Sequence, residues 1–226
     1  GLITNETMQS TNMEARELEE HAEYCVMELI YNHGLFGDDV YVSPTSDYDD
    51  YFNATDLIVE IDQRGRFKNL GIDVTVATNP DILTEKEERV LAELDSYAGQ
   101  RIKYFLSDEN PAIGGKIKIP KVILAIKPDS IKQIREILGK GRVMSAKDKQ
   151  TIDSIRIEIA DALVYQLGNY IKFLERRLER AREEESDQNR DAYYSEEELS
   201  GYDSSIKFEK ALQVHKWLLR FFEKLK

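Results

Sequence analysis

The 226-residue sequence predicts an α/β core followed by a long helical extension. Short β-branched apolar runs alternate with segments of helical periodicity over the first 140 residues, whereas beyond residue 147 the apolar residues recur only at helical spacing. Hydrophobic residues make up 41% of the chain, which is enough to build a substantial core. We therefore expect an α/β core over residues 13–140 and a pair of long helices over residues 147–226.

The core elements follow one another in the order helix, strand, strand, strand, helix, strand. Apolar residues at helical spacing predict a first helix over residues 13–33, which Gly34 ends. The second and third strand candidates flank a short polar turn, which predicts a hairpin, and the last candidate is apolar enough to be buried on both faces. The predicted strands cover residues 39–43, 55–61, 70–77 and 121–126, and the second helix covers residues 84–98.

Three further helices complete the prediction. A short one covers residues 129–138, and two amphipathic helices cover residues 147–183 and 205–225. We expect the last two helices to form a hairpin whose apolar face packs on the sheet or on a second subunit, which would make the protein a homodimer.

The charge is unevenly distributed along the chain, whose net charge is −12. Residues 1–110 carry 8 basic and 24 acidic side chains, whereas residues 111–150 carry 10 basic and 3 acidic ones. The net charge argues against a protein that coats nucleic acid nonspecifically. The acidic part is suited to a divalent metal, and residues 111–150 are candidates for contacting nucleic acid; the alternative is that both are solvated faces of opposite sign.

The sequence also bears on the compartment. No apolar run approaches the ~20 residues that a membrane span needs, so no membrane partner is expected. Cys25 is the only cysteine, and residues 1–20 lack the basic start and apolar stretch of a signal peptide. These features predict a cytoplasmic protein.

Three acidic residues fall where the predicted fold would bring them together. Asp56 opens the second strand, and Asp73 lies in the middle of the apolar third strand, where burying an unpaired carboxylate is costly. Glu23, with Glu19 as the second choice, lies on the first helix, which must pack on that sheet. Converging carboxylates suit Mg²⁺ or Mn²⁺, which can promote hydrolysis of a phosphodiester.

These residues resemble the PD-(D/E)XK nuclease superfamily, which has the restriction-endonuclease-like αβββαβ fold. Asp56 matches the acidic residue at the start of its second strand, and Asp73 matches the first residue of (D/E)-x-K on the third. Glu23 lies eleven residues before Gly34, as does the helix Glu of the Holliday-junction resolvase branch. Residues 93–97 (ELDSY) are similar to the Q-x-x-x-Y motif of RecB-like relatives. The resemblance covers roughly residues 13–127 and implies a nuclease in which Asp56, Asp73 and Glu23 hold the metal.

Thr75 departs from this family pattern, because it stands where the family has its catalytic Lys. The family Lys orients the attacking water and stabilises charge, whereas a Thr hydroxyl can hold a water but supplies no positive charge. We expect Lys86, near the start of the following helix, to supply that charge, with Lys121 as the alternative. Two functions therefore remain open: a metal-dependent nuclease, or an inactive protein of the same fold that serves as an interaction or structural module.

Overall fold

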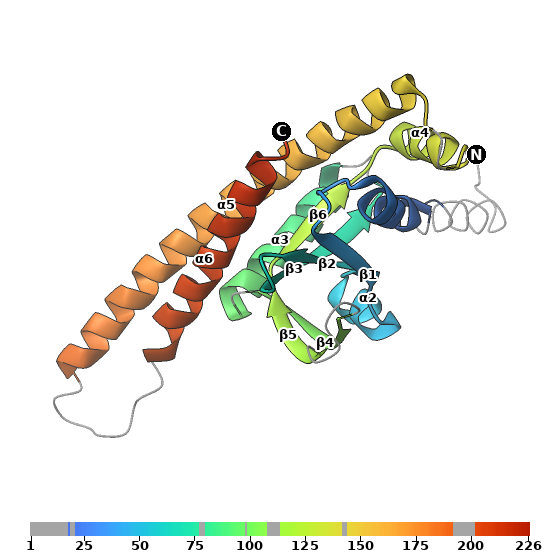
Figure 1. Ribbon diagram of the computed structural model, residues 1–226. Helices are drawn as coiled ribbons and strands as arrows, with labels where there is room; N and C mark the ends of the chain where they lie inside the picture. The colour runs from blue at the N-terminus through green and yellow to red at the C-terminus, as the bar shows by residue number, and fades with distance from the viewer. Residues whose placement is uncertain are drawn as a thin grey trace, which may run out of the picture.

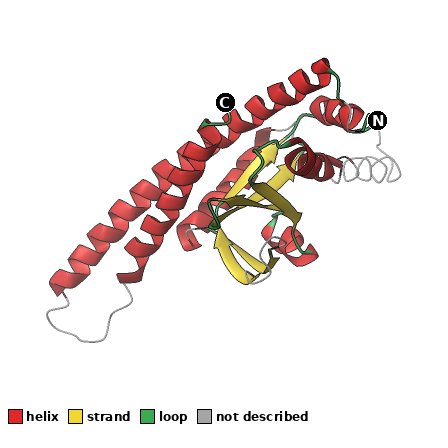
Figure 2. Ribbon diagram, in the orientation of Figure 1, coloured by secondary structure: helices red, strands yellow, loops and turns green. Residues whose placement is uncertain are grey.

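The computed structural model describes residues 18, 21–76, 80–97, 99–107, 114–141, 144–191 and 202–226. It is a mixed α/β structure in which two long helices run beside a small sheet (Figures 1 and 2). Residues 21–33 form a helix. The elements that follow are β1 (Val40–Pro44), α2 (Asp47–Asn53), β2 (Leu57–Asp62), β3 (Phe67–Thr75), α3 (Pro80–Tyr97), β4 (Gln100–Leu106), β5 (Gly114–Ile119), β6 (Lys121–Ala125), α4 (Pro128–Leu138), α5 (Ala146–Asp191) and α6 (Tyr202–Glu223).

The main sheet has the strand order β1-β2-β3-β6. β1, β2 and β3 are antiparallel neighbours, and β6 runs parallel to β3. Two parallel strands need a long crossover connection, which α3 and the β4–β5 hairpin provide here. The register pairs Leu57 with Ile72 and Asp73 with Ile123, so β3 is held between β2 and β6 at the level of Asp73.

A tight turn joins β2 to β3 and fixes their register. Arg64 and Gly65 both have positive φ, and the backbone N–H of Gly65 donates to the Asp62 carboxylate at 2.6 Å. Gln63 and Arg66 exchange backbone hydrogen bonds across the turn. The β-branched and apolar residues of the two strands are almost entirely buried. The sequence signals of a hairpin are therefore realised by a well-defined turn.

The pair α5–α6 packs along the sheet and shares its core. Phe36, which follows the first helix, meets Phe222 of α6 edge to face with ring centroids 5.2 Å apart. On α5, the Gln166 side chain accepts from the backbone N–H of Ile123 at 2.9 Å and donates to the Ile123 carbonyl at 2.6 Å. This side chain therefore satisfies the backbone at the outer edge of β6, which would otherwise be open to pairing with another chain.

The predicted α/β class is confirmed for the described residues. The six predicted core elements are present, but α2 interrupts them between β1 and β2, and the β4–β5 hairpin interrupts them between α3 and β6. The sequence analysis missed both of these elements. Helix α3 begins at Pro80 rather than at residue 84. No helix in the described parts of the chain has an apolar stretch long enough to cross a bilayer.

Candidate functional site

Asp56 and Asp73 lie side by side at the open end of the β2–β3 hairpin, away from the turn that joins the two strands. Asp56 directly precedes β2, and Asp73 follows Ile72, the residue with which Leu57 of β2 is paired. The Asp56 carboxylate accepts a hydrogen bond from the backbone N–H of Val74 at 2.6 Å. Burial, then the negative charge of Asp73, then that of Glu23 raise the pKa of Asp56 to about 8. The two aspartates thus come together as the sequence predicted.

Glu23 brings a third carboxylate to the same place from the helix of residues 21–33. Its side chain is half-buried, and its charge acts on Asp56 strongly enough to contribute to the raised pKa of that carboxyl. Glu19, the second choice, lies outside the described residues. Glu23 therefore adds a third negative charge to the surroundings of Asp56, and neighbouring negative charges of this kind disfavour ionisation of a carboxyl unless positive charge is also near.

Lys86 supplies positive charge to this cluster. It lies in the first half of α3, and its Nζ is 2.5 Å from Oδ1 of Asp73, whose side chain is almost fully buried. Thr75 lies two residues beyond Asp73 on β3, on the same face of the strand, and is also buried. Of the two lysines considered from the sequence, Lys86 is the one that reaches the predicted acidic pair.

Lys121 forms a second, neighbouring ion pair. Its buried ammonium lies 3.4 Å from a carboxylate oxygen of Glu93 on α3 and donates to the Asn53 carbonyl at 3.0 Å. Burial raises the pKa of Glu93 and lowers that of Lys121; the charge of each opposes the shift of the other. The charge of Asp73 acts on both groups. Glu93, the first residue of the segment similar to the Q-x-x-x-Y motif, therefore belongs to the same network of charges. The side chain of Tyr97, the last residue of that segment, lies outside the described residues.

Helix α5 adds Tyr170, which the sequence analysis placed only on an apolar helix face. Its hydroxyl donates to Gln166 at 3.4 Å, and burial, followed by the charges of Glu87, Asp73 and Glu93, raises its pKa. Tyr170 is therefore buried within reach of the charges of Asp73 and Glu93. The spacing of apolar residues along the predicted helix did not indicate that Tyr170 would lie close to these acids.

The arrangement does not amount to a preformed metal centre. Among the described residues, no group of three or more His, Cys, Asp or Glu side chains is arranged to hold a metal ion. The Asp73 carboxylate is engaged by Lys86, and that of Asp56 by the backbone N–H of Val74. The three predicted ligands share one electrostatic environment without surrounding a common point.

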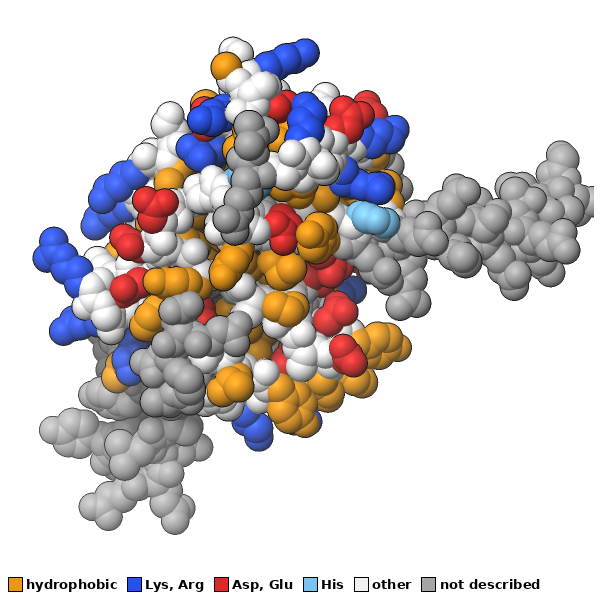
Figure 3. Space-filling model, turned by 45° about the vertical axis from the view of Figure 1, so that its right-hand side comes forward, with side chains coloured by type: hydrophobic (Ala, Val, Ile, Leu, Met, Phe, Trp, Pro, Cys, Tyr) orange, Lys and Arg blue, Asp and Glu red, His pale blue; other side chains and the backbone are white. Residues whose placement is uncertain are grey.

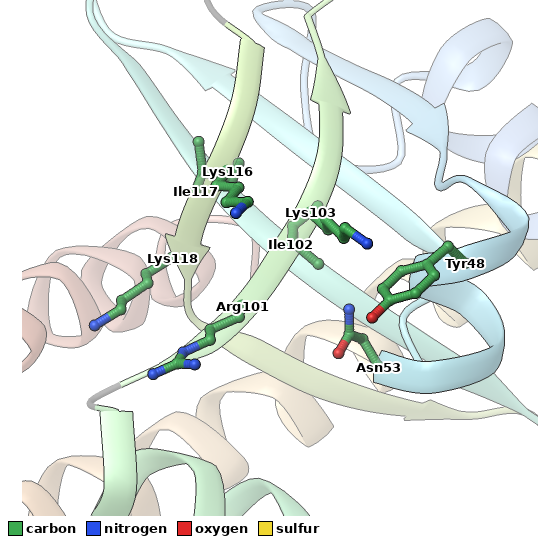
Figure 4. A pocket seen from close by; sticks show the side chains of 8 residues that line it. All are labelled: Tyr48, Asn53, Arg101, Ile102, Lys103, Lys116, Ile117 and Lys118. Atoms are coloured by element: carbon green, nitrogen blue, oxygen red, sulfur yellow. The ribbon is translucent and has the colours of Figure 1, made fainter.

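The basic residues of the stretch 111–150 do not form one surface. Lys121 is buried, Lys127 pairs with Glu158 at 2.8 Å, and Lys140 pairs with Asp148 at 2.8 Å. Lys116 and Lys118 of β5 behave differently, because they line a pocket together with Arg101 and Lys103 of β4 (Figure 4). In the described part of the predicted basic region, Lys116 and Lys118 thus contribute to one basic pocket with two cations of β4.

The chain was compared with protein-family models, with curated proteins and with solved structures, and no match was found in any of the three.

Proposed function

We propose that this protein is a metal-dependent nuclease that hydrolyses phosphodiester bonds of nucleic acid, built on a restriction-endonuclease-like core. The observation that carries the proposal is the pair of neighbouring buried acids Asp56 and Asp73, with the ammonium of Lys86 on Asp73 and the charge of Glu23 acting on Asp56. Acids from a helix and two adjacent strands, beside a lysine, are the groups that such a reaction needs.

The element order and strand pairing support the same proposal. The helix of residues 21–33, β1, β2, β3, α3 and β6 follow one another in the αβββαβ order of that superfamily, with β6 parallel to β3. The hairpin β4–β5 is then an insertion in the crossover between these two strands. Asp56 and Asp73 occupy the positions in this order at which the superfamily carries its acidic pair.

The donor chemistry fits a hard divalent cation. A carboxyl whose pKa is raised to about 8 by burial and two neighbouring acids is costly to ionise, and a cation bound between them would remove much of that cost. Glu23, Asp56 and Asp73 would hold Mg²⁺ or Mn²⁺, both of which accept carboxylate oxygens. When bound, the ion would supply Lewis-acid stabilisation and a more acidic water.

The chain's own residues have distinct tasks in this proposal. Lys86 supplies the positive charge that the superfamily places two residues after the strand acid, where this chain has Thr75. From α3 its ammonium can donate a hydrogen bond to the attacking water and stabilise negative charge in the transition state. The hydroxyl of Thr75 can hold the water by a further hydrogen bond.

A second candidate is an inactive protein of the same fold that acts as an interaction or structural module. Thr75 in place of the strand lysine favours this candidate, as does the absence of a three-residue metal cluster from the described residues. Lys86 at Asp73 favours the nuclease instead, because it supplies beside the acidic pair the positive charge that Thr75 lacks.

The two candidates are separated by metal binding and cleavage measured on the same preparations. The full chain, freed of metal with EDTA, is titrated calorimetrically with Mn²⁺ and then assayed on labelled DNA and RNA. We expect binding and cleavage by the wild type, loss of both in Asp73→Asn, and retention of both in Glu85→Gln, an exposed acid beside Lys86. Binding without cleavage of any substrate would support the second candidate. Absence of binding would overturn the metal site itself.

A further inference from the structure

Exposed aromatic rings cluster where α2 meets β4. Tyr48 contacts Phe52 and Tyr104, with ring centroids 4.7 Å and 5.5 Å apart, and Phe52 also contacts Tyr51. Tyr51, Phe52 and Tyr104 remain 81%, 67% and 55% exposed. We call Tyr48, Tyr51, Phe52 and Tyr104 the aromatic platform. Exposed hydrophobic side chains are prominent at the lower right of the view in Figure 3. Such a concentration of exposed rings is typical of a binding surface.

Four basic side chains lie beside the aromatic platform. Arg101, Lys103, Lys116 and Lys118 line a pocket of about 520 Å³ together with Tyr48 and Asn53 (Figure 4), and we call these four the cation pocket. Arg101 and Lys118 are direct partners in the β4–β5 ladder, an arrangement in which like charges destabilise each other. On a chain with a net charge of −12, this concentration of positive charge matches an anionic ligand.

The platform and the pocket are one surface, because Lys103 joins them. Its ammonium lies 4.1 Å from the ring centroid of Tyr48 and 4.8 Å from that of Tyr104. A buried carboxylate holds the two halves in place: Asp49 of α2 accepts hydrogen bonds from the backbone N–H groups of Lys103 at 2.8 Å and Tyr104 at 2.9 Å. The surface is therefore pre-organised, which lowers the entropic cost of binding.

This surface is connected to the acidic cluster by a short stretch of chain. Asn53 lines the cation pocket, and its carbonyl accepts from the ammonium of Lys121, the partner of Glu93. Asp56 follows Asn53 by three residues. A ligand in the pocket thus lies beside the segment that presents the first acid of the site.

We propose that the aromatic platform and the cation pocket bind a single-stranded segment of nucleic acid and deliver it to the acidic cluster. The bases stack on the exposed rings of Tyr51, Phe52 and Tyr104, and the phosphates contact Arg101, Lys116 and Lys118. A single strand is favoured over a duplex because only unpaired bases expose the faces on which aromatic rings stack. The role as substrate rests on the proposed nuclease function, whereas the binding itself does not.

The test measures binding without metal, so that it is independent of cleavage. Fluorescence anisotropy in EDTA compares the full chain on labelled single-stranded DNA, single-stranded RNA and a duplex of the same sequence. We expect preference for one or both single strands over the duplex. The double variant Phe52→Ala/Tyr104→Ala should weaken that binding at least tenfold, since each stacked base contributes about 1–3 kcal/mol. Replacing Lys116 and Lys118 by Gln should weaken it and reduce the slope of log K against log salt by roughly 1.4.

The matched control is Lys210→Gln/Arg220→Gln, which removes two exposed cations from α6 and should leave both affinity and slope unchanged. Equal affinity for duplex and single strands, or unchanged affinity in the aromatic variant, would overturn the inference. The nuclease proposal can fail independently of the binding surface. If single strands bind as expected in EDTA but are not cleaved after metal is added, the nuclease proposal is wrong and the single-strand binding surface is still supported. Cleavage of single strands with an unchanged KM in the aromatic variant sinks the surface alone.

Discussion

The ammonium of Lys86 lies 2.5 Å from a carboxylate oxygen of Asp73, so that a helix supplies positive charge to the middle of a buried strand. Thr75, two residues further along the same strand, is buried and supplies no charge of its own. The cationic group therefore depends on how α3 is seated against β3, and this dependence leads to the first prediction.

Replacing Lys86 by Met should impair both stability and catalysis. Without the ammonium, Asp73 keeps a buried charge beside Asp56, so we expect the free energy of unfolding to fall by about 1–3 kcal/mol. If the nuclease proposal holds, kcat should fall by about 10²–10³. Urea denaturation and single-turnover cleavage measure the two effects. Lys86→Arg should recover part of the activity, and equal losses in Glu85→Gln would show that the effect is not specific to the ammonium.

The raised pKa of Asp56 predicts a stability that falls as the pH rises. Between the ordinary Asp value of 3.8 and about 8, the folded chain keeps a proton that the unfolded chain has lost, so unfolding releases it. The stabilisation is fully present below pH 3.8 and is lost as the pH approaches 8. In EDTA, Asp56→Asn should therefore gain roughly 4 kcal/mol over the wild type between pH 5 and pH 8.5, because each pH unit up to the raised pKa contributes about 1.4 kcal/mol for one proton. The control variant Asp153→Asn, at an exposed position of α5, should have a pH profile of stability parallel to that of the wild type. A parallel profile for Asp56→Asn as well would refute the prediction.

Removing the Gln166 amide should loosen the outer edge of the sheet. Gln166→Ala leaves the N–H and carbonyl of Ile123 without their side-chain partner, which should cost about 2–3 kcal/mol of stability. Hydrogen exchange at the Ile123 amide should accelerate more than at Leu70, in the interior of the sheet. Gln150→Ala, at an exposed position of the same helix, is the control. Unchanged protection of Ile123 would mean that the amide contributes nothing to edge closure.

His215 predicts a loss of stability in mild acid. The ring is fully buried between α5 and α6; its Nδ1 donates to the Ala211 carbonyl at 2.8 Å, and Nε2 has no hydrogen-bond partner within the described residues. Burial lowers its pKa to about 4, so between pH 6.5 and 4 the unfolded chain binds a proton that the folded chain does not. Stability should fall by about 2 kcal/mol from pH 8 to pH 5 through this residue.

The variant His215→Leu isolates that contribution. It should lose less stability than the wild type between pH 8 and pH 5 in chemical denaturation, whereas His33→Gln, at a partly exposed position, should follow the wild type. The opposite ranking of His215→Leu and the wild type would contradict the depressed pKa.

The predicted site residues could be found because their signals are local. Asp73 interrupts an apolar strand, and Asp56 opens the strand that pairs with it, so the hairpin alone brings them together. Lys86 could be predicted because Thr75 leaves the site without positive charge and Lys86 lies near the start of the helix that follows the strand. Its contact with Asp73 confirms that it reaches the predicted acidic pair; the metal, the reaction and the nucleic acid stay predictions.

The missed elements depend on contacts between distant residues. Helix α2 is only seven residues long, and it is anchored by the backbone N–H groups of Lys103 and Tyr104 on β4, which donate to the Asp49 carboxylate from about fifty residues further along the chain. β4 and β5 carry too many exposed charges for their alternation to stand out. The nearness of Tyr170 to the acids depends on how α5 crosses the sheet edge, which helical periodicity does not specify.

Gln100 and Ile119 face each other at the base of the β4–β5 hairpin, so the chain enters and leaves this insertion at a single point. A segment attached in this way can be shortened, lengthened or exchanged without changing the strand order β1-β2-β3-β6 of the main sheet. The pairing of β3 with β6 therefore does not depend on the length of this hairpin.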